Sequence, residues 1–166
     1  KRFGKYGLTI HPDKTRLVPF RIPSSTATDR DRSDDRPRTF DFLGFTHFWA
    51  RSRRGKWIVK RKTASNRLSR AVRSIDSWCR FNRHQPIGLQ QQKLSQKLRG
   101  HYAYYGITGN GKALSRFFYE VQRCWRKWLN RRNRTRNWTV FQRLLQRYPL
   151  APTRTVHSVC RHVVNP

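Results

Sequence analysis

The chain has 166 residues, of which 38 are Lys or Arg and 8 are Asp or Glu, so its formal net charge is +30 at pH 7. Hydrophobic residues make up 36% of the chain, enough for one modest core, and no apolar run reaches the roughly 18 residues that a membrane span needs. A charge this large opposes folding through self-repulsion, and a bound polyanion relieves that cost. Composition therefore argues against a membrane partner and favours a nucleic acid.

The first part of the chain reads as short extended segments and polar turns. Residues 1–20 alternate apolar and polar positions around a His-Pro-Asp turn, and residues 21–39 form a loop that mixes Arg with Asp. Strand-like runs at 40–49 and 57–62 flank a turn and predict a β-hairpin. Thus we expect a first domain over residues 1–62.

The remaining sequence has helical periodicity. Its apolar positions predict helices over about 64–82, 89–105 and 112–132, then a short helix closed by Pro149. The residues expected to mark helix ends are Thr63 or Ser65 and Thr139 as N-caps, Gly106 as a left-handed C-cap, and Pro86 with Gly88 as terminators of the first helix. The predicted fold class is α+β: a short β-hairpin, a bundle of three to four helices over 63–148, and a basic tail at 149–166.

The aromatic residues of the bundle fall into two groups, according to whether their helical positions lie on or off an apolar stripe. Tyr102, Tyr105, Trp125 and Trp128 lie on the apolar stripes and are expected in the core, whereas Tyr104 falls off its stripe. The cysteines, at positions 79, 124 and 160, lack the spacing of a zinc site, so we expect no bound metal and a reduced core thiol at position 79. His157 and His162 are expected to be exposed histidines of the tail.

A nuclease is one alternative function. Two-metal hydrolysis needs carboxylates that hold two cations, and the one adjacent acidic pair is Asp34-Asp35. Arg32 and Arg36 flank the pair within a polar loop, so a charge-balanced loop is favoured over a metal site.

Three motifs together resemble the group II intron-encoded reverse transcriptase/maturase family. The segment GLTIHPDKT at 7–15 resembles the late palm motif, with Lys14 at the position of its lysine. The segment FDFLGF at 40–45 resembles the primer grip that closes the palm. The segment LRGHYAYYGITGN at 98–110, with the helix after it, resembles the maturase-specific thumb, domain X. Residues 1–62 would then be a palm remnant and residues 63–148 the thumb.

The resemblance implies a fragment of an RNA-directed DNA polymerase. The family's aromatic-x-Asp-Asp centre would lie upstream of Lys1, and the chain contains no Met, so we expect a missing N-terminal part and no catalysis by this chain alone. Lys14 would assist triphosphate chemistry only with the missing palm. The chain itself would bind no cofactor, because the Mg²⁺ ions belong to the full-length polymerase and to the intron RNA.

The predicted primer grip comprises Phe42, Leu43, Gly44 and Phe45. Glycine inside a strand allows another backbone to approach, and that backbone is either the primer strand or the hairpin's own core. In both cases Phe42 and Phe45 are expected to pack inside.

The implied partners are group II intron RNA, the primer–template duplex and the missing finger and palm region, in a bacterial cytoplasm with nucleoid association. Phosphates dominate such binding, and aromatic rings stack on unpaired bases. The expected RNA contacts are Arg99, His101, Tyr104, Lys112, Arg116, Arg123, Arg126, Lys127, Arg131 and Arg132. The rival function is a generic basic RNA- or DNA-binding module without intron specificity.

Overall fold

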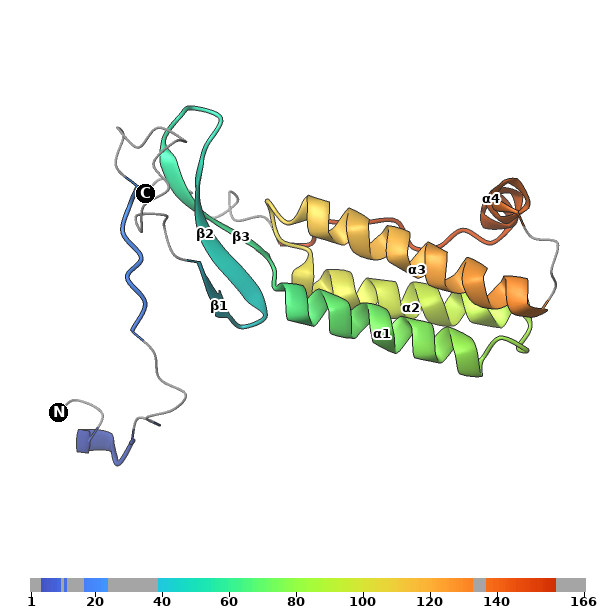
Figure 1. The fold of residues 1–166 in the computed structure, drawn as a ribbon, viewed down its shortest axis with the longest axis horizontal. Helices are drawn as coiled ribbons and strands as arrows, with labels where there is room; N and C mark the ends of the chain where they lie inside the picture. Colours follow the sequence, from blue (N-terminus) through green and yellow to red (C-terminus); the bar gives the residue numbers. More distant parts are fainter. Residues whose placement is uncertain (1–3, 10, 12–16, 24–38, 133–136, 158–166) are drawn as a thin grey trace. The chain divides into compact units, whose positions relative to one another are not determined.

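A computed structural model describes residues 4–9, 11, 17–23, 39–132 and 137–157. Its elements are a 3-10 turn Gly4–Tyr6, strands β1 Phe40–Phe42, β2 Phe45–Arg51 and β3 Trp57–Thr63, and helices α1 Ser65–Phe81, α2 Ile87–Tyr105, α3 Gly111–Arg132 and α4 Trp138–Arg147 (Figure 1). An antiparallel sheet in the order β1-β2-β3 precedes four helices, so the α+β prediction is confirmed. The chain divides into two compact units, one of residues 1–40 and 47–60, the other of residues 41–46 and 61–166.

Two tight turns connect the strands. Leu43 and Gly44 both have positive φ, at 47° and 79°, which is the geometry of a two-residue type I′ turn between β1 and β2. The predicted strand 40–49 is therefore wrong in one respect, because Gly44 reverses the chain instead of lying inside a strand. Between β2 and β3, the Ser52 amide donates to the Lys56 carbonyl over 2.8 Å. This closes the hairpin that the sequence predicts.

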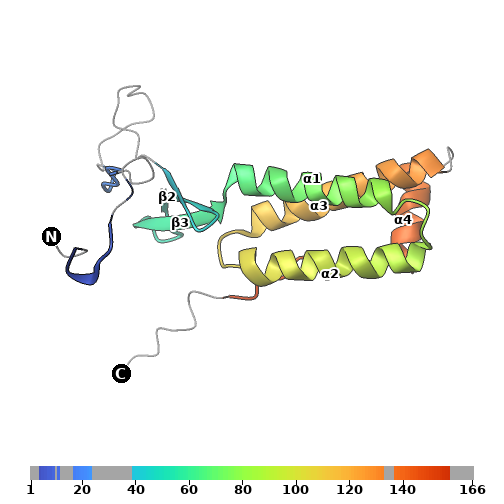
Figure 2. The same cartoon turned by 90° about the horizontal axis from the view of Figure 1, so that it is seen from below.

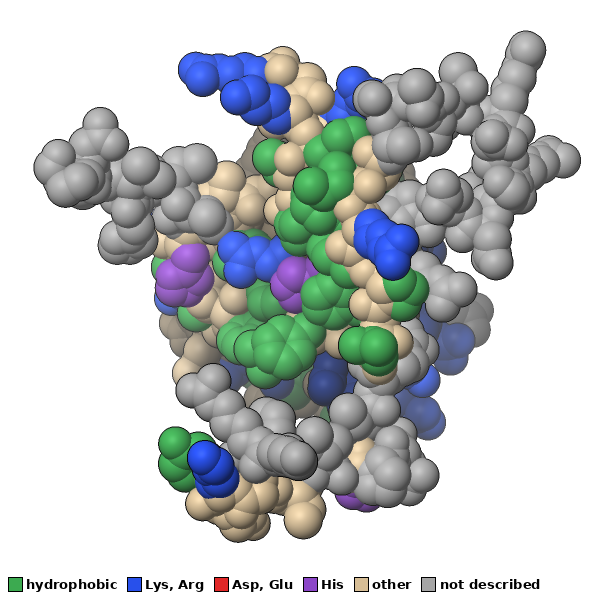
Figure 3. All heavy atoms as spheres, turned by 90° about the vertical axis from the view of Figure 1, so that its left-hand side faces the viewer, with side chains coloured by type: hydrophobic (Ala, Val, Ile, Leu, Met, Phe, Trp, Pro, Cys, Tyr) green, Lys and Arg blue, Asp and Glu red, His purple; other side chains and the backbone are tan. Residues whose placement is uncertain are grey.

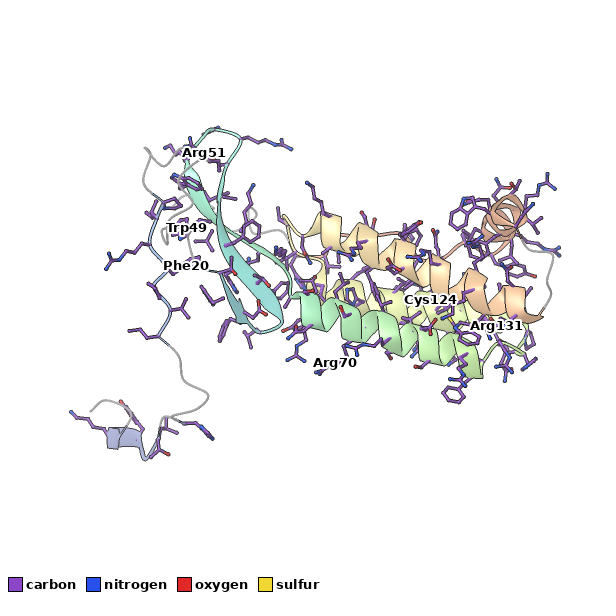
Figure 4. The ribbon with its side chains drawn as sticks, viewed as in Figure 1. Phe20, Trp49, Arg51, Arg70, Cys124 and Arg131 are labelled. Carbon is purple, nitrogen blue, oxygen red and sulfur yellow. The ribbon has the colours of Figure 1, made fainter. Side chains whose placement is uncertain are left out.

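Aromatic rings stack within the first unit. The Phe20 and Trp49 rings stack with centroids 5.2 Å apart, and Figure 4 shows these two side chains next to each other. The ring of Phe40 stacks on that of His47 at 4.8 Å, and the Arg51 guanidinium lies 5.1 Å from a Trp57 ring. The Phe20 contact joins the segment 17–23 to the hairpin, and the other two lie among the strands.

The second unit is a helical bundle with one core. Helix α3 packs against α1 and α2, and α4 crosses near the C-terminal end of α3 (Figures 1 and 2). The fully buried apolar side chains include Leu94, Leu98, Leu114, Phe117, Val121, Trp125, Leu129 and Phe141. These positions confirm the predicted apolar stripes.

Two tryptophans of the core also use their indole N–H: Trp125 Nε1 donates to Gln90 Oε1 at 2.9 Å, and Trp128 Nε1 donates to Asp76 Oδ1 at 2.9 Å.

The predicted N-caps are wrong, because tertiary contacts use those side chains differently. Ala64 is the N-cap of α1 and makes no side-chain capping bond. Thr63 is buried and bonds to Asn110 instead. For α4 the N-cap is Asn137, whose side chain accepts from the Val140 amide at 2.9 Å. Thr139 lies inside that helix.

The predicted roles of three helix-terminating residues also need correction. Helix α1 ends at Phe81, before Pro86, and Pro86 is the N-cap of α2, with Gly88 in its first turn. Gly106 has φ −75°, so it is not a left-handed cap. Glycine is needed there for space, since a Cβ atom would lie 2.8 Å from the Arg154 carbonyl oxygen.

That close approach comes from the segment 149–157, which returns along the bundle to the turn between α2 and α3 (Figure 1). Leu150 and Ala151 are buried in the core. The Val156 amide donates to the Gly106 carbonyl at 2.7 Å, and His157 forms a parallel β-bridge with Ile107. The start of the predicted tail is thus packed on the bundle. Across the described ranges, none of the helices combines the length and apolarity needed to cross a membrane.

Candidate nucleic-acid interface

The turn between α2 and α3 is organised by a single buried amide. Asn110 Oδ1 accepts from the Thr63 amide at 2.9 Å, and its Nδ2 donates to Thr63 Oγ1 and to the Tyr105 carbonyl, both at 2.8 Å. Its carbonyl accepts from Leu114 in the first turn of α3. The Asn110 side chain therefore joins the end of β3 to the end of α2, and its backbone carbonyl caps the start of α3. The sequence analysis did not identify Asn110, although an asparagine between two glycines of a turn could have indicated a structural role.

Two tyrosines of α2 contact the predicted primer grip. Tyr104 Oη donates to the Leu43 carbonyl at 2.8 Å, and a Cβ atom at Gly44 would lie 3.0 Å from Tyr105 Oη. The buried Phe45 ring is 5.7 Å from that of Tyr104 and 5.3 Å from that of Tyr105. The turn that contains Gly44 thus packs against the helical core of its own chain. A role in holding a primer stays a prediction.

The expectation that Phe42 packs inside is wrong. Phe42 is the last residue of the three-residue edge strand β1, and its side chain is 59% exposed. An edge strand is paired on one side only, so the sheet does not enclose it. Phe45, by contrast, is buried as predicted.

His101, predicted as an RNA contact, is half-buried, with its ring packed on the side chains of the bundle. The ring stacks on Phe117 at a centroid distance of 3.9 Å and lies 4.6 Å from Tyr105. Burial lowers the pKa of His101 to about 4, so the imidazole is neutral at physiological pH. Tyr102 is buried as predicted, and burial raises its pKa. Both groups support the turn by packing on the core.

We expect the half-buried His101 to make the fold sensitive to acid. Between about pH 6.5 and pH 4 the unfolded chain binds a proton at this residue and the folded chain does not. The free energy of unfolding therefore falls as the pH is lowered through this window. Urea unfolding at about pH 7 and pH 5 measures the fall, and His101→Phe, which keeps a ring against Phe117, should reduce it. An equal fall in both proteins would contradict the assignment.

The predicted cations of α3 share one outer face. Lys112, Arg116, Arg123, Arg126 and Lys127 recur at helical spacing opposite the buried stripe, and all but the half-buried Arg126 are exposed. Two further predicted contacts, Arg99 on α2 and Arg131 near the end of α3, are exposed as well, and Figure 4 marks Arg131. The side chain of Arg132 lies outside the described residues. Most of the predicted cations thus belong to one helix surface.

Two acidic residues partly neutralise this face. Arg123 pairs with Glu120 at 3.2 Å, and Lys127 pairs with Asp76 at 3.0 Å. Burial opposes ionisation of Asp76, but hydrogen bonds from Trp128 and Lys127 outweigh it and lower the pKa of Asp76. Residues 63–148 contain no other Asp or Glu, so the surface stays strongly positive. Figure 3 views the end of the chain that carries the strands, not the face of α3, and there too no acidic side chain is visible among the coloured residues.

Positive charge alone does not single out α3, because exposed cations occur on all four helices. The other exposed cations include Arg70, Arg73 and Arg80 on α1, Lys93 and Lys97 on α2, and Arg143 and Arg147 on α4. What distinguishes the α3 face is that the aromatic side chains beside its cations are exposed, because the rings beneath Lys97 and Arg147, those of Trp78 and Tyr148, are half-buried. The Arg123 guanidinium lies 5.9 Å from the Tyr119 ring, and that of Arg126 lies 5.0 Å from the Trp138 ring. Tyr119 lies off the apolar stripe, a signal that sequence reasoning did not use.

Other predicted groups give a mixed outcome. Lys14, Asp34 and Asp35 lie outside the described residues. Cys79 is a free, buried thiol as predicted, and burial raises its pKa to about 12. His157 is exposed, with Nε2 2.8 Å from the Ala103 carbonyl oxygen. Within the part of the chain that the structure covers, no three His, Cys, Asp or Glu side chains gather as a metal site would require.

Three features therefore bear on function. They are the α2–α3 turn with the adjacent Tyr104 and Tyr105, the Leu43-Gly44 turn packed on these tyrosines, and the cationic face of α3 with its aromatic neighbours. The family resemblance rests on the motifs at 7–15, 40–45 and 98–110. Comparisons of the chain with models of protein families, with curated proteins and with solved structures find no match.

Proposed function

We propose that this chain is the RNA-binding C-terminal part of a group II intron reverse transcriptase/maturase. The observation that carries the proposal is the contact between the Leu43-Gly44 turn and Tyr104 and Tyr105. These residues belong to two of the three motifs of the resemblance, about 60 residues apart in sequence. A primer grip and a thumb would need such a connection in order to hold one primer–template duplex between them.

In this proposal the chain binds and positions nucleic acid, and the reacting centres lie elsewhere. Exposed cations such as Lys112 and Arg116 neutralise phosphates and release counterions. The polymerase carboxylates and their Mg²⁺ would come from a finger and palm region outside this chain, and the splicing chemistry from Mg²⁺ held by the intron RNA. The role of the protein in splicing is to stabilise the folded intron, in the bacterial cytoplasm where intron and template occur.

A generic basic RNA-binding module is the second candidate, and the exposed cations on all four helices favour it. The two functions differ in selectivity. Measuring the affinity for a group II intron RNA and for an unrelated structured RNA of equal length, at about 0.3 M salt, separates them because salt suppresses phosphate binding. Preferential binding of intron RNA supports the maturase function, and equal affinities would favour the generic module.

Replacing Arg116 and Arg123 together by Ala should lower the salt slope of RNA binding by about 1–2 units, because each phosphate contact contributes about 0.7–0.9. The slope of log affinity against log salt concentration, from a titration of intron RNA, measures the effect. The matched control is Arg70→Ala with Arg73→Ala, which removes the same charge from α1. An equal decrease in both double variants would show that RNA does not prefer the α3 face.

A further inference from the structure

Aromatic side chains interrupt the row of cations on the outer face of α3. Tyr119 lies on this face between Arg116 and Arg123, and its side chain is 50% exposed. Seven residues beyond Tyr119, Arg126 extends over the indole of Trp138, in the first turn of α4, which is 39% exposed. The phosphate contacts described above do not require either ring.

The two rings have a second feature in common, which is a guanidinium group beside each of them. Arg123 lies 5.9 Å from the Tyr119 ring centroid and Arg126 lies 5.0 Å from that of Trp138. A guanidinium binds phosphate bidentately and also stacks on flat rings. A nucleotide at such a pair can place its base on the part of the aromatic ring that the guanidinium leaves exposed and its phosphate on the arginine. The face thus fits a strand that presents both groups.

We propose that the outer face of α3 binds unpaired RNA, with bases stacked on Tyr119 and Trp138 and phosphates on Arg116, Arg123 and Arg126. Bases in a duplex are already stacked on their neighbours, so they are not free to cover a protein ring. Single-stranded segments have free base faces, and stacking on aromatic side chains is sequence-tolerant. The inference deepens the proposed function, on which it rests, by naming single-stranded or looped-out nucleotides as the ligand of this face.

The spacing of the two rings sets a further constraint. Tyr119 and Arg126 are seven residues apart, which is about 10 Å along the helix axis. Nucleotides in a stacked strand rise only about 3.4 Å each. Because Arg126 lies over the Trp138 ring, we place at least one nucleotide between the bases on the two rings. Replacing one ring should consequently leave the other able to bind.

The test compares the affinity of the whole chain for two RNAs with equal numbers of phosphates, a single strand of about 12 nucleotides and a duplex. Tyr119→Ala and Trp138→Ala should each weaken single-strand binding about 5-fold or more, as expected for loss of one stacked base, and change duplex binding less than about twofold. Tyr119→Phe and Trp138→Phe keep the rings and should restore the affinity. Trp138→Phe also keeps a ring beside Phe141, in case the Ala variant unfolds α4.

Two controls make the result decisive. Phe81→Ala removes an aromatic side chain that is 81% exposed at the end of α1, and it should leave single-strand binding nearly unchanged. A single strand with abasic sites keeps its phosphates but has no bases, so the wild type and both Ala variants should bind it equally. Equal losses on single strand and duplex, or tight binding of abasic RNA by the wild type, would overturn the inference. The ratio of intron to unrelated RNA tests the proposed function separately, so the two failures are distinguishable.

Discussion

Replacing Asn110 by Ala is expected to lower the free energy of unfolding by about 3–5 kcal/mol. The Asn110 side chain is buried and bonds the Thr63 amide, the Thr63 hydroxyl and the Tyr105 carbonyl. Truncation removes all three bonds and leaves the Thr63 amide and hydroxyl without this partner, while the Tyr105 carbonyl still accepts from the Ile107 amide. Each buried polar group left unpaired costs about 1–3 kcal/mol. Urea denaturation followed by circular dichroism measures the loss. The effect should be large because these bonds connect the end of β3 to the end of α2.

Asn137→Ala provides the matched control for this prediction. Asn137 is also an asparagine at the start of a helix, but it is exposed and makes the single capping bond to the Val140 amide. Loss of an exposed cap costs about 0.5–2 kcal/mol. Asn110→Asp separates the functions of the amide, because it keeps the acceptor for Thr63 and loses both donors. A loss at position 110 no larger than that at position 137 would contradict the role of Asn110.

Leu114→Ala should destabilise the bundle by about 2–5 kcal/mol, since it removes a fully buried side chain and leaves a cavity. Leu114 lies in the first turn of α3, is 1% exposed, and belongs to the same cluster as Leu98 and Phe117. Phe118, its neighbour along the stripe, is only partly buried, so Phe118→Ala should cost less. Thermal unfolding of both variants gives the order. An unchanged melting temperature for Leu114→Ala would mean that the stripe of α3 is misphased.

The extent of the helices was predictable because their apolar residues repeat over many turns. The sequence placed α3 at 112–132, and the structure has Gly111–Arg132. The caps were less predictable, since a cap depends on which groups lie nearby in space. Thr63 has the side chain of a good N-cap, but its hydroxyl instead accepts a hydrogen bond from Asn110, which is distant in sequence. At Gly106 a Cβ atom would meet both the Tyr102 carbonyl oxygen, four residues earlier, and the Arg154 carbonyl oxygen, and a local pattern cannot reveal the second contact.

In the candidate site, too, contacts between residues that are distant in sequence could not be predicted from local patterns. The cationic positions of α3 follow from helical phase, and their exposure agrees with it. The bond from Tyr104 to Leu43 and the packing of Tyr105 on Gly44 join residues about 60 positions apart, so periodicity carries no signal for them. Helical phase also carried no signal for the ring contact of His101. His101 lies near the α2–α3 turn, where the sequence predicts an exposed side chain, but its ring packs on Phe117.

The return of residues 149–157 to the α2–α3 turn has a consequence for synthesis on the ribosome. The amide of Thr108 donates to the His157 carbonyl at 3.0 Å, and Ala151 donates to Ser95 at 3.2 Å, so α2 completes its contacts with the last part of the described chain. Until residue 157 emerges, the Gly106 carbonyl has to be solvated by water. Nascent chains that stop before this point should therefore be more susceptible to proteases than completed ones, because an incompletely packed bundle opens more often.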